Sequence, residues 1–123
     1  NRKKIPFVRS LRFALNGLII SARERDMKIH YTAAVLVTIF GVIFSISWTE
    51  WLFVLTCVGG VIALEMVNTA IEKAVDLVTD QYHELARQAK DLAAGAVLIY
   101  ALYSVAAGLV IFLPKIISLL HSL

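Results

Sequence analysis

"WLFVLTCVGGVIALEMVNTAIEKAVD", residues 51–76, is an apolar run that turns polar without losing its helical spacing. Residues 51–64 carry no charge, and the side chains that follow include Glu65, Asn68, Glu72 and Asp76. At about 100° per residue, these four side chains fall within about 80° of one another on a helix. A charged residue at mid-bilayer costs at least about 2.5–3.5 kcal/mol, so such residues usually face a protein interior and mark a site. The segment therefore predicts a membrane-spanning helix with a polar functional stripe.

The composition of the whole chain supports a membrane protein. The 123 residues are 59% hydrophobic and 17% charged, which is too apolar for a soluble domain of this size and too short for two domains. A helix needs about 20 residues to cross a hydrocarbon core about 30 Å thick. We expect an all-α integral membrane protein of a single domain, 1–123. The predicted spans are 29–47, 50–78 and 82–120, the last with a cytoplasmic N-terminal extension.

The segment before the first span predicts a surface helix over residues 5–28. Apolar side chains recur there at three- and four-residue spacing, at Val8, Leu11, Leu15, Leu18 and Ala22. The other side carries Arg9, Arg12, Asn16 and Arg23. This pattern is typical of an amphipathic helix that lies on the inner leaflet with its basic face toward anionic headgroups. Charges throughout residues 1–30 are not typical of a cleavable signal peptide.

The distribution of Lys and Arg predicts the orientation. Eight of the twelve precede the first span, whereas the short loop 45–50 has none. The eight are Arg2, Lys3, Lys4, Arg9, Arg12, Arg23, Arg25 and Lys28. The positive-inside rule then places the N-terminus and the 79–91 connection in the cytoplasm and the C-terminus outside, in a bacterial cytoplasmic membrane.

The depth of the acidic residues indicates their chemistry. Counted from Trp51, Glu65 lies about 21 Å along the helix and Glu72 about 31 Å, near the cytosolic edge of the apolar layer. Carboxylates that share one place repel unless a cation intervenes, and Mg²⁺ typically takes one or two carboxylates with water and phosphates. Desolvation makes a deep carboxylate a stronger base. Glu65 therefore suits a general base and Glu72 a metal ligand, in Mg²⁺-dependent chemistry at the inner leaflet.

Longer motifs give a family resemblance. "ALEMVNTAIEKAVDLV", residues 63–78, followed by "HELARQAKDLAAGAVLI", residues 83–99, resembles the prokaryotic diacylglycerol kinase family of small membrane lipid kinases. The resemblance runs from Arg9 to Leu113. The pieces "NTAIE" and "VDLVTD" and the Glu50–Trp51 pair look more like the undecaprenol kinase branch than the diacylglycerol branch.

The resemblance implies transfer of the γ-phosphoryl group of ATP to a lipid alcohol, with Mg²⁺, in a homotrimer with shared sites. The resemblance implies that Glu65 is the catalytic base, that Glu24 and Glu72 are Mg²⁺ ligands, and that Asn68 and Asp76 are supporting polar residues. It implies nucleotide contacts at Gln81, Tyr82, His83, Lys90 and Asp91, with Glu24 and Glu72. It also implies lipid or nucleotide contacts at Arg9, Phe13 and Asn16. The sequence has no G-x-x-x-x-G-K-[ST] motif, so a kinase here needs a different nucleotide site.

Several alternatives stay open on the sequence alone. Undecaprenol and diacylglycerol both present a hydroxyl at the same depth. A small proton- or cation-coupled transporter could use Glu65 as its carrier site, although the outer part of the spans offers it almost no polar groups. A non-catalytic membrane subunit is a third reading. The same residues could also have purely structural roles. Glu65 and Asn68 could form hydrogen bonds between helices, Asp76 could be a solvated surface charge, and Lys90 could reach lipid headgroups.

Overall fold

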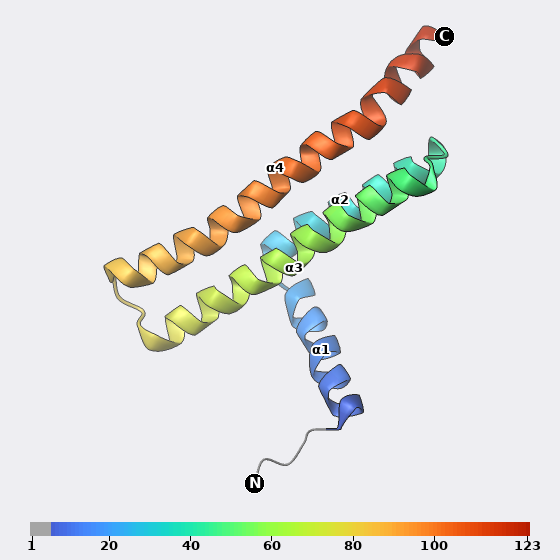
Figure 1. Ribbon diagram of the computed structural model, residues 1–123. Helices are drawn as coiled ribbons and strands as arrows, with labels where there is room; N and C mark the ends of the chain where they lie inside the picture. Colours follow the sequence, from blue (N-terminus) through green and yellow to red (C-terminus); the bar gives the residue numbers. More distant parts are fainter. Residues whose placement is uncertain (1–5) are drawn as a thin grey trace.

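The computed structural model describes residues 6–123, and these residues form four α-helices. The helices are α1 (Phe7–Ala22), α2 (Arg25–Ile43), α3 (Trp48–Val78) and α4 (Glu84–His121). Helices α3 and α4 lie side by side and antiparallel, α2 packs along α3, and α1 leaves the bundle at an angle (Figure 1). The predicted all-α class is confirmed. Arg2, Lys3, Lys4 and the start of the predicted surface helix lie outside the described residues.

Three of the helices are long and apolar enough to cross a membrane, as the sequence predicts: α2, α3 and α4. Helices of 31 and 38 residues, such as α3 and α4, are about 46 and 57 Å long, well beyond the about 30 Å of a hydrocarbon core. The surplus length carries the polar ends of both helices. The polar connection between α3 and α4, residues 79–83, closes this end of the hairpin.

The opposite end of the α3–α4 pair is closed by a cap and an ion pair. The Ser47 hydroxyl accepts a hydrogen bond from the Glu50 amide at 3.2 Å, and the Glu50 carboxylate accepts one from the Ser47 amide at 3.0 Å. This reciprocal pair satisfies two amides at the helix start. Lys115 of α4 donates to the same carboxylate at 2.9 Å. Glu50 and Lys115 therefore neutralise each other at this end of the bundle, far along both helices from the acidic stripe.

Helix α1 is attached to the bundle through small and polar side chains. Ser21 is buried, and its hydroxyl lies 3.3 Å from the Tyr31 hydroxyl of α2. The Met66 side chain of α3 lies close to Gly17. The larger apolar side chains of α1 are exposed, among them Val8, Leu11, Leu15 and Leu18. A single chain thus leaves most of the apolar surface of α1 uncovered.

A close contact between α3 and α4 depends on Gly60. The ring of Tyr100 occupies the place where a side chain at Gly60 would begin, and the Tyr100 hydroxyl donates to the Thr56 carbonyl at 2.9 Å. This ring both fills the helix interface and satisfies its own polar atom. The absence of a side chain at Gly60 is therefore a packing requirement.

Gly60→Ala is expected to destabilise the protein by about 1–3 kcal/mol, because the new methyl group forces the Tyr100 ring out of its position. Thermal unfolding in detergent measures the effect. Gly59→Ala is the matched control, since nothing lies within 4 Å of a methyl group there, and it should be neutral or slightly stabilising. Equal stability of the two variants would contradict this account of the interface.

Candidate functional site

Three side chains of the predicted polar stripe are brought together on α3. Asn68 donates from Nδ2 to Glu72 Oε1 at 3.0 Å and lies 3.4 Å from Glu65 Oε1. The helix creates this contact because positions three and four residues apart are neighbours on its surface. Glu65 is 6% exposed and Asn68 is 7% exposed. One amide therefore joins a buried carboxylate to one nearer the helix end.

Helix α2 adds a residue that the sequence analysis missed. His30 Nε2 lies 3.4 Å from Glu65 Oε2, with only 8% of the Glu65 side chain exposed. This histidine lies at the start of the predicted span 29–47, but no spacing in the sequence links it to Glu65. Only the packing of α2 on α3 puts the two side chains together.

Glu24, predicted as a metal ligand, lies at the start of α2 as its N-cap residue. Its Oε1 is 3.1 Å from the Lys73 ammonium of α3, a second residue that the sequence analysis missed. Lys73 directly follows Glu72, so Glu24 meets α3 at the level of the stripe. Both charged side chains of this pair are partly exposed.

The donor set around Glu72 fits a hard cation. Within residues 6–123, no three His, Cys, Asp or Glu side chains are grouped closely enough to hold a metal ion. Mg²⁺ needs fewer protein ligands, since it usually keeps several waters and takes one or two carboxylates with substrate phosphates. Asn68 Oδ1 is buried and has no hydrogen-bond partner, so a further oxygen is available beside Glu72. The chemistry of these oxygens suits Mg²⁺, while the roles of Glu24 and Glu72 as its ligands stay predictions.

The predicted nucleotide segment forms a polar pocket of about 270 Å³ where α3 turns into α4. The predicted residues Gln81, Tyr82, His83, Lys90 and Asp91 all line it, together with Asp76. Lys90 donates to Asp76 Oδ1 at 2.7 Å, which joins α4 to the stripe on α3. This pair joins Asp76 to α4, while 60% of the Asp76 side chain stays exposed.

Two residues of the turn also shape the start of α4. His83 Nδ1 accepts from the Leu85 amide at 3.1 Å and so caps the helix. The Tyr82 hydroxyl donates to Glu84 Oε2 at 2.7 Å. These bonds order the backbone that surrounds the pocket, and they leave His83 Nε2 available to a ligand.

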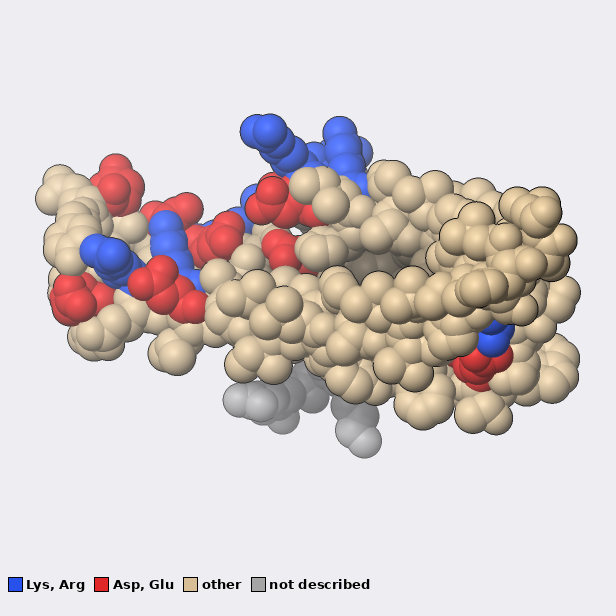
Figure 2. Space-filling view, turned by 90° about the horizontal axis from the view of Figure 1, so that it is seen from above, with Lys and Arg blue, Asp and Glu red and all other residues tan. Residues whose placement is uncertain are grey.

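Charge is distributed unevenly over the molecule. Figure 2 shows acidic and basic side chains gathered over one half of this face, with one small acidic and basic patch at the opposite end. Arg9, Phe13 and Asn16, predicted as lipid or nucleotide contacts, lie exposed on α1. Their side chains make no hydrogen bond or ion pair with other described residues, so one chain does not bring them into the stripe.

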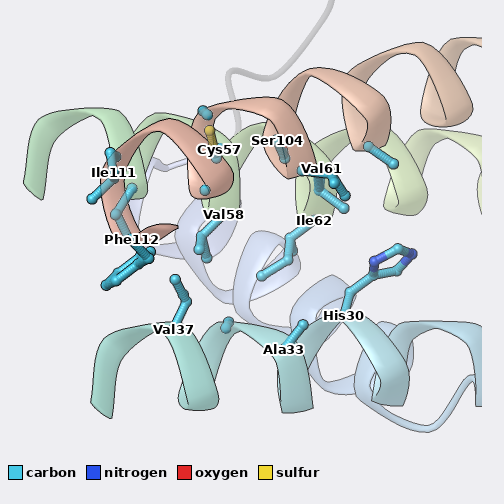
Figure 3. A pocket seen from close by; sticks show the side chains of 16 residues that line it. His30, Ala33, Val37, Cys57, Val58, Val61, Ile62, Ser104, Ile111 and Phe112 are labelled. Carbon is cyan, nitrogen blue, oxygen red and sulfur yellow. The ribbon is translucent and has the colours of Figure 1, made fainter. Parts of the chain in front are cut away.

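An apolar groove of about 270 Å³ lies between α2, α3 and α4 (Figure 3). Its lining is almost entirely aliphatic and includes Val37, Val58, Ile62 and Ile111. His30 lies at one end of the lined region, and Phe112 lies at the other (Figure 3). The groove thus runs from the histidine that contacts Glu65 into the apolar part of the bundle.

The fold and the site define a small helical membrane enzyme with an acidic centre beside a polar pocket. The sequence profile described as prokaryotic diacylglycerol kinase matches residues 12–112, most of the chain. The chain belongs to the prokaryotic diacylglycerol kinase family and is a lipid kinase.

Individual relatives identify the branch. The chain is 46% identical to an undecaprenol kinase of Bacillus subtilis (strain 168) over 111 residues, which cover 89% of this chain and 90% of that protein. It is 39% identical over 115 residues to a diacylglycerol kinase of Synechocystis sp., covering 90% of this chain but only 65% of that longer protein. A diacylglycerol kinase of Escherichia coli (strain K12) is 44% identical over 45 residues, 37% of each chain. The high identity and mutual coverage of the first relative place the chain in the undecaprenol kinase branch.

Proposed function

We propose that this protein transfers the γ-phosphoryl group of ATP to undecaprenol at the cytoplasmic surface of the bacterial plasma membrane. The observation that carries the proposal is the amide of Asn68, which joins buried Glu65 to Glu72 at the edge of the apolar region. This arrangement connects a base at lipid depth with an acidic residue nearer water. The similarity to the Bacillus undecaprenol kinase supports undecaprenol as the acceptor.

Each residue has a role in this mechanism. Glu65 accepts the proton of the lipid hydroxyl or orients that hydroxyl for attack. Glu24 and Glu72 would hold Mg²⁺, which supplies positive charge against the phosphates of ATP. Lys90 adds a further positive charge beside the polar pocket, and Asp76 holds the ammonium in place. Phosphoryl transfer needs mainly positioning and charge neutralisation, so a small helical protein can provide it.

The proposed orientation places the N-terminus and the α3–α4 connection in the cytoplasm. The positive-inside rule supports it, since Arg and Lys gather at this end of the spans. In this arrangement α1 lies on the inner leaflet, and its exposed apolar side chains face lipid. The nucleotide pocket then opens to the compartment that contains ATP.

The active form is proposed to be a homotrimer with shared sites. Within residues 6–123, one chain groups no three potential metal ligands, and it leaves large apolar side chains exposed on every helix. A neighbouring protomer would cover part of this surface and add polar groups to the site. Native mass spectrometry of the active protein should show a trimer, whereas an active monomer would refute the proposal.

The direct test supplies purified protein with labelled ATP, Mg²⁺ and either undecaprenol or diacylglycerol at equal mole fraction in the same detergent micelles. We expect undecaprenyl phosphate to form at least about ten times faster than phosphatidic acid, which is about 1.4 kcal/mol of discrimination. A faster reaction with diacylglycerol would assign the chain that acceptor instead. No lipid phosphate from either alcohol would refute the proposed function.

Lys90→Gln is expected to raise the KM for ATP by about tenfold with a smaller change in kcat, because a charge-assisted contact beside the pocket is lost. Steady-state kinetics with varied ATP measures both parameters. Lys115→Gln is the matched control, since it breaks another lysine–carboxylate pair, with Glu50, at the opposite end of the bundle. An unchanged KM in Lys90→Gln would separate this lysine from nucleotide binding.

A further inference from the structure

His30 lies between two features of the molecule that are otherwise separate. On one side its Nε2 is 3.4 Å from Glu65 Oε2. On the other side it lines the apolar groove between α2, α3 and α4, which Glu65 itself does not line (Figure 3). The side chain of His30 is 23% exposed, so it borders the groove while it touches the buried carboxylate.

The contacts of Glu65 are few and long. Its described polar partners are His30 on one oxygen and Asn68 on the other, each at 3.4 Å. Charge-assisted hydrogen bonds are typically about 2.7–2.9 Å, so neither contact is tight. Catalytic hydrogen bonds are often long before substrate binds and shorten in the reacting complex. The carboxylate is therefore enclosed and oriented but keeps capacity to accept a hydrogen bond from a hydroxyl.

Two lysines near the stripe already have carboxylate partners. Lys73 pairs with Glu24 at 3.1 Å, and Lys90 pairs with Asp76 at 2.7 Å. Glu72 takes its hydrogen bond from Asn68. Among the described residues, His30 is the basic side chain that lies within 4 Å of the Glu65 carboxylate.

We propose that His30 is a positioning residue for Glu65 in lipid phosphorylation. Its imidazole holds the carboxylate at the inner end of the apolar groove, where the hydroxyl of a membrane alcohol meets the base. This inference rests on the proposed function and adds to it a residue of α2 that orients the base from outside the stripe. The polar pocket begins at Val75, about 15 Å farther along α3 than Glu65, so we expect a change at His30 to affect the lipid step far more than ATP binding.

The test compares His30→Ala with His30→Gln, which keeps a neutral donor of similar reach. We expect His30→Ala to lower kcat about 10- to 100-fold, with the KM for ATP within about twofold of wild type. His30→Gln should retain at least about a third of wild-type kcat. The matched control on the same helix is Thr38→Ala, which loses only a hydroxyl bonded to the Ala34 carbonyl and should behave as wild type.

A double-mutant cycle with Glu65→Asp separates positioning from a general structural role. If His30 acts through Glu65, His30→Ala should cost much less in the Glu65→Asp background than in wild type. If the losses of kcat in the two single variants multiply fully in the double variant, the proposal is overturned. The same holds if the kcat of His30→Ala lies within twofold of wild type, or if His30→Gln is as inactive as His30→Ala. If the wild-type protein itself phosphorylates no lipid alcohol, the proposed function fails, and that result is distinct from a failure at His30.

Discussion

Glu65→Gln is expected to lower kcat for lipid phosphorylation by about 10²–10⁴-fold, the range that a general base typically contributes. The amide keeps the size and the hydrogen bond from Asn68 but cannot accept the proton of the lipid hydroxyl. Because the carboxylate is buried, replacing it with a neutral group also removes a desolvation cost, so the variant should be at least as stable as wild type. Formation of labelled lipid phosphate at saturating ATP and lipid measures the loss.

The matched control for this prediction is Glu50→Gln on the same helix. Glu50 caps the far end of α3 and pairs with Lys115, so its replacement tests the effect of losing one carboxylate outside the site. We expect the control to retain most of the wild-type kcat with a modest loss of stability. Substantial turnover by Glu65→Gln would show that the base lies elsewhere.

Removal of Mg²⁺ is the second change with a large expected effect. Chelation should reduce lipid phosphorylation to background, and added Mg²⁺ should restore it. Glu72→Gln should raise the Mg²⁺ concentration for half-maximal activity more than about tenfold, because a neutral amide oxygen binds a hard cation more weakly than a carboxylate does. The carbonyl of the substituted side chain can still accept from Asn68 Nδ2, so the fold of α3 is preserved. Activity titrated against Mg²⁺ at fixed ATP gives the shift.

Two further variants sharpen this second prediction. Glu24→Gln should shift the Mg²⁺ dependence in the same direction, since Glu24 is the other proposed ligand at this level of the bundle. Glu50→Gln again serves as the control, because this carboxylate caps the far end of α3 and pairs with Lys115 outside the site. A shift in the control equal to that of Glu72→Gln would point to a general loss of acidic charge and against a specific metal ligand.

Much of the stripe could be predicted from the sequence because its geometry is local. Glu65, Asn68 and Glu72 lie three and four residues apart, and any helix brings such positions together. The grouping of Gln81, Tyr82 and Lys90 around one pocket was also predictable, given a short turn between two antiparallel helices. The pairing of Lys90 with Asp76 specifies how that turn closes, and it required the observed packing of α4 on α3.

The contacts that cross between helices could not be predicted in this way. His30 reaches Glu65, and Lys73 reaches Glu24, only because α2 and α3 pack at a particular rotation and height. Nothing in the sequence around Gly60 indicates that this position accommodates the Tyr100 ring of α4. Hydrophobic periodicity shows which face of a helix is apolar. It does not show which side chain of another helix each residue contacts, because that depends on the distances between helices.

The amino-acid order alone specified an all-helical membrane protein with an acidic stripe near one end of a span, because a bilayer requires apolar spans of a set length and makes a buried charge expensive. The three-dimensional packing decided which groups meet: His30 beside the base, an apolar groove leading to it, and Lys73 on Glu24. The reason is physical. Insertion energies act on each residue separately along the chain, whereas a reactive site needs several side chains from different helices within a few ångströms of one another.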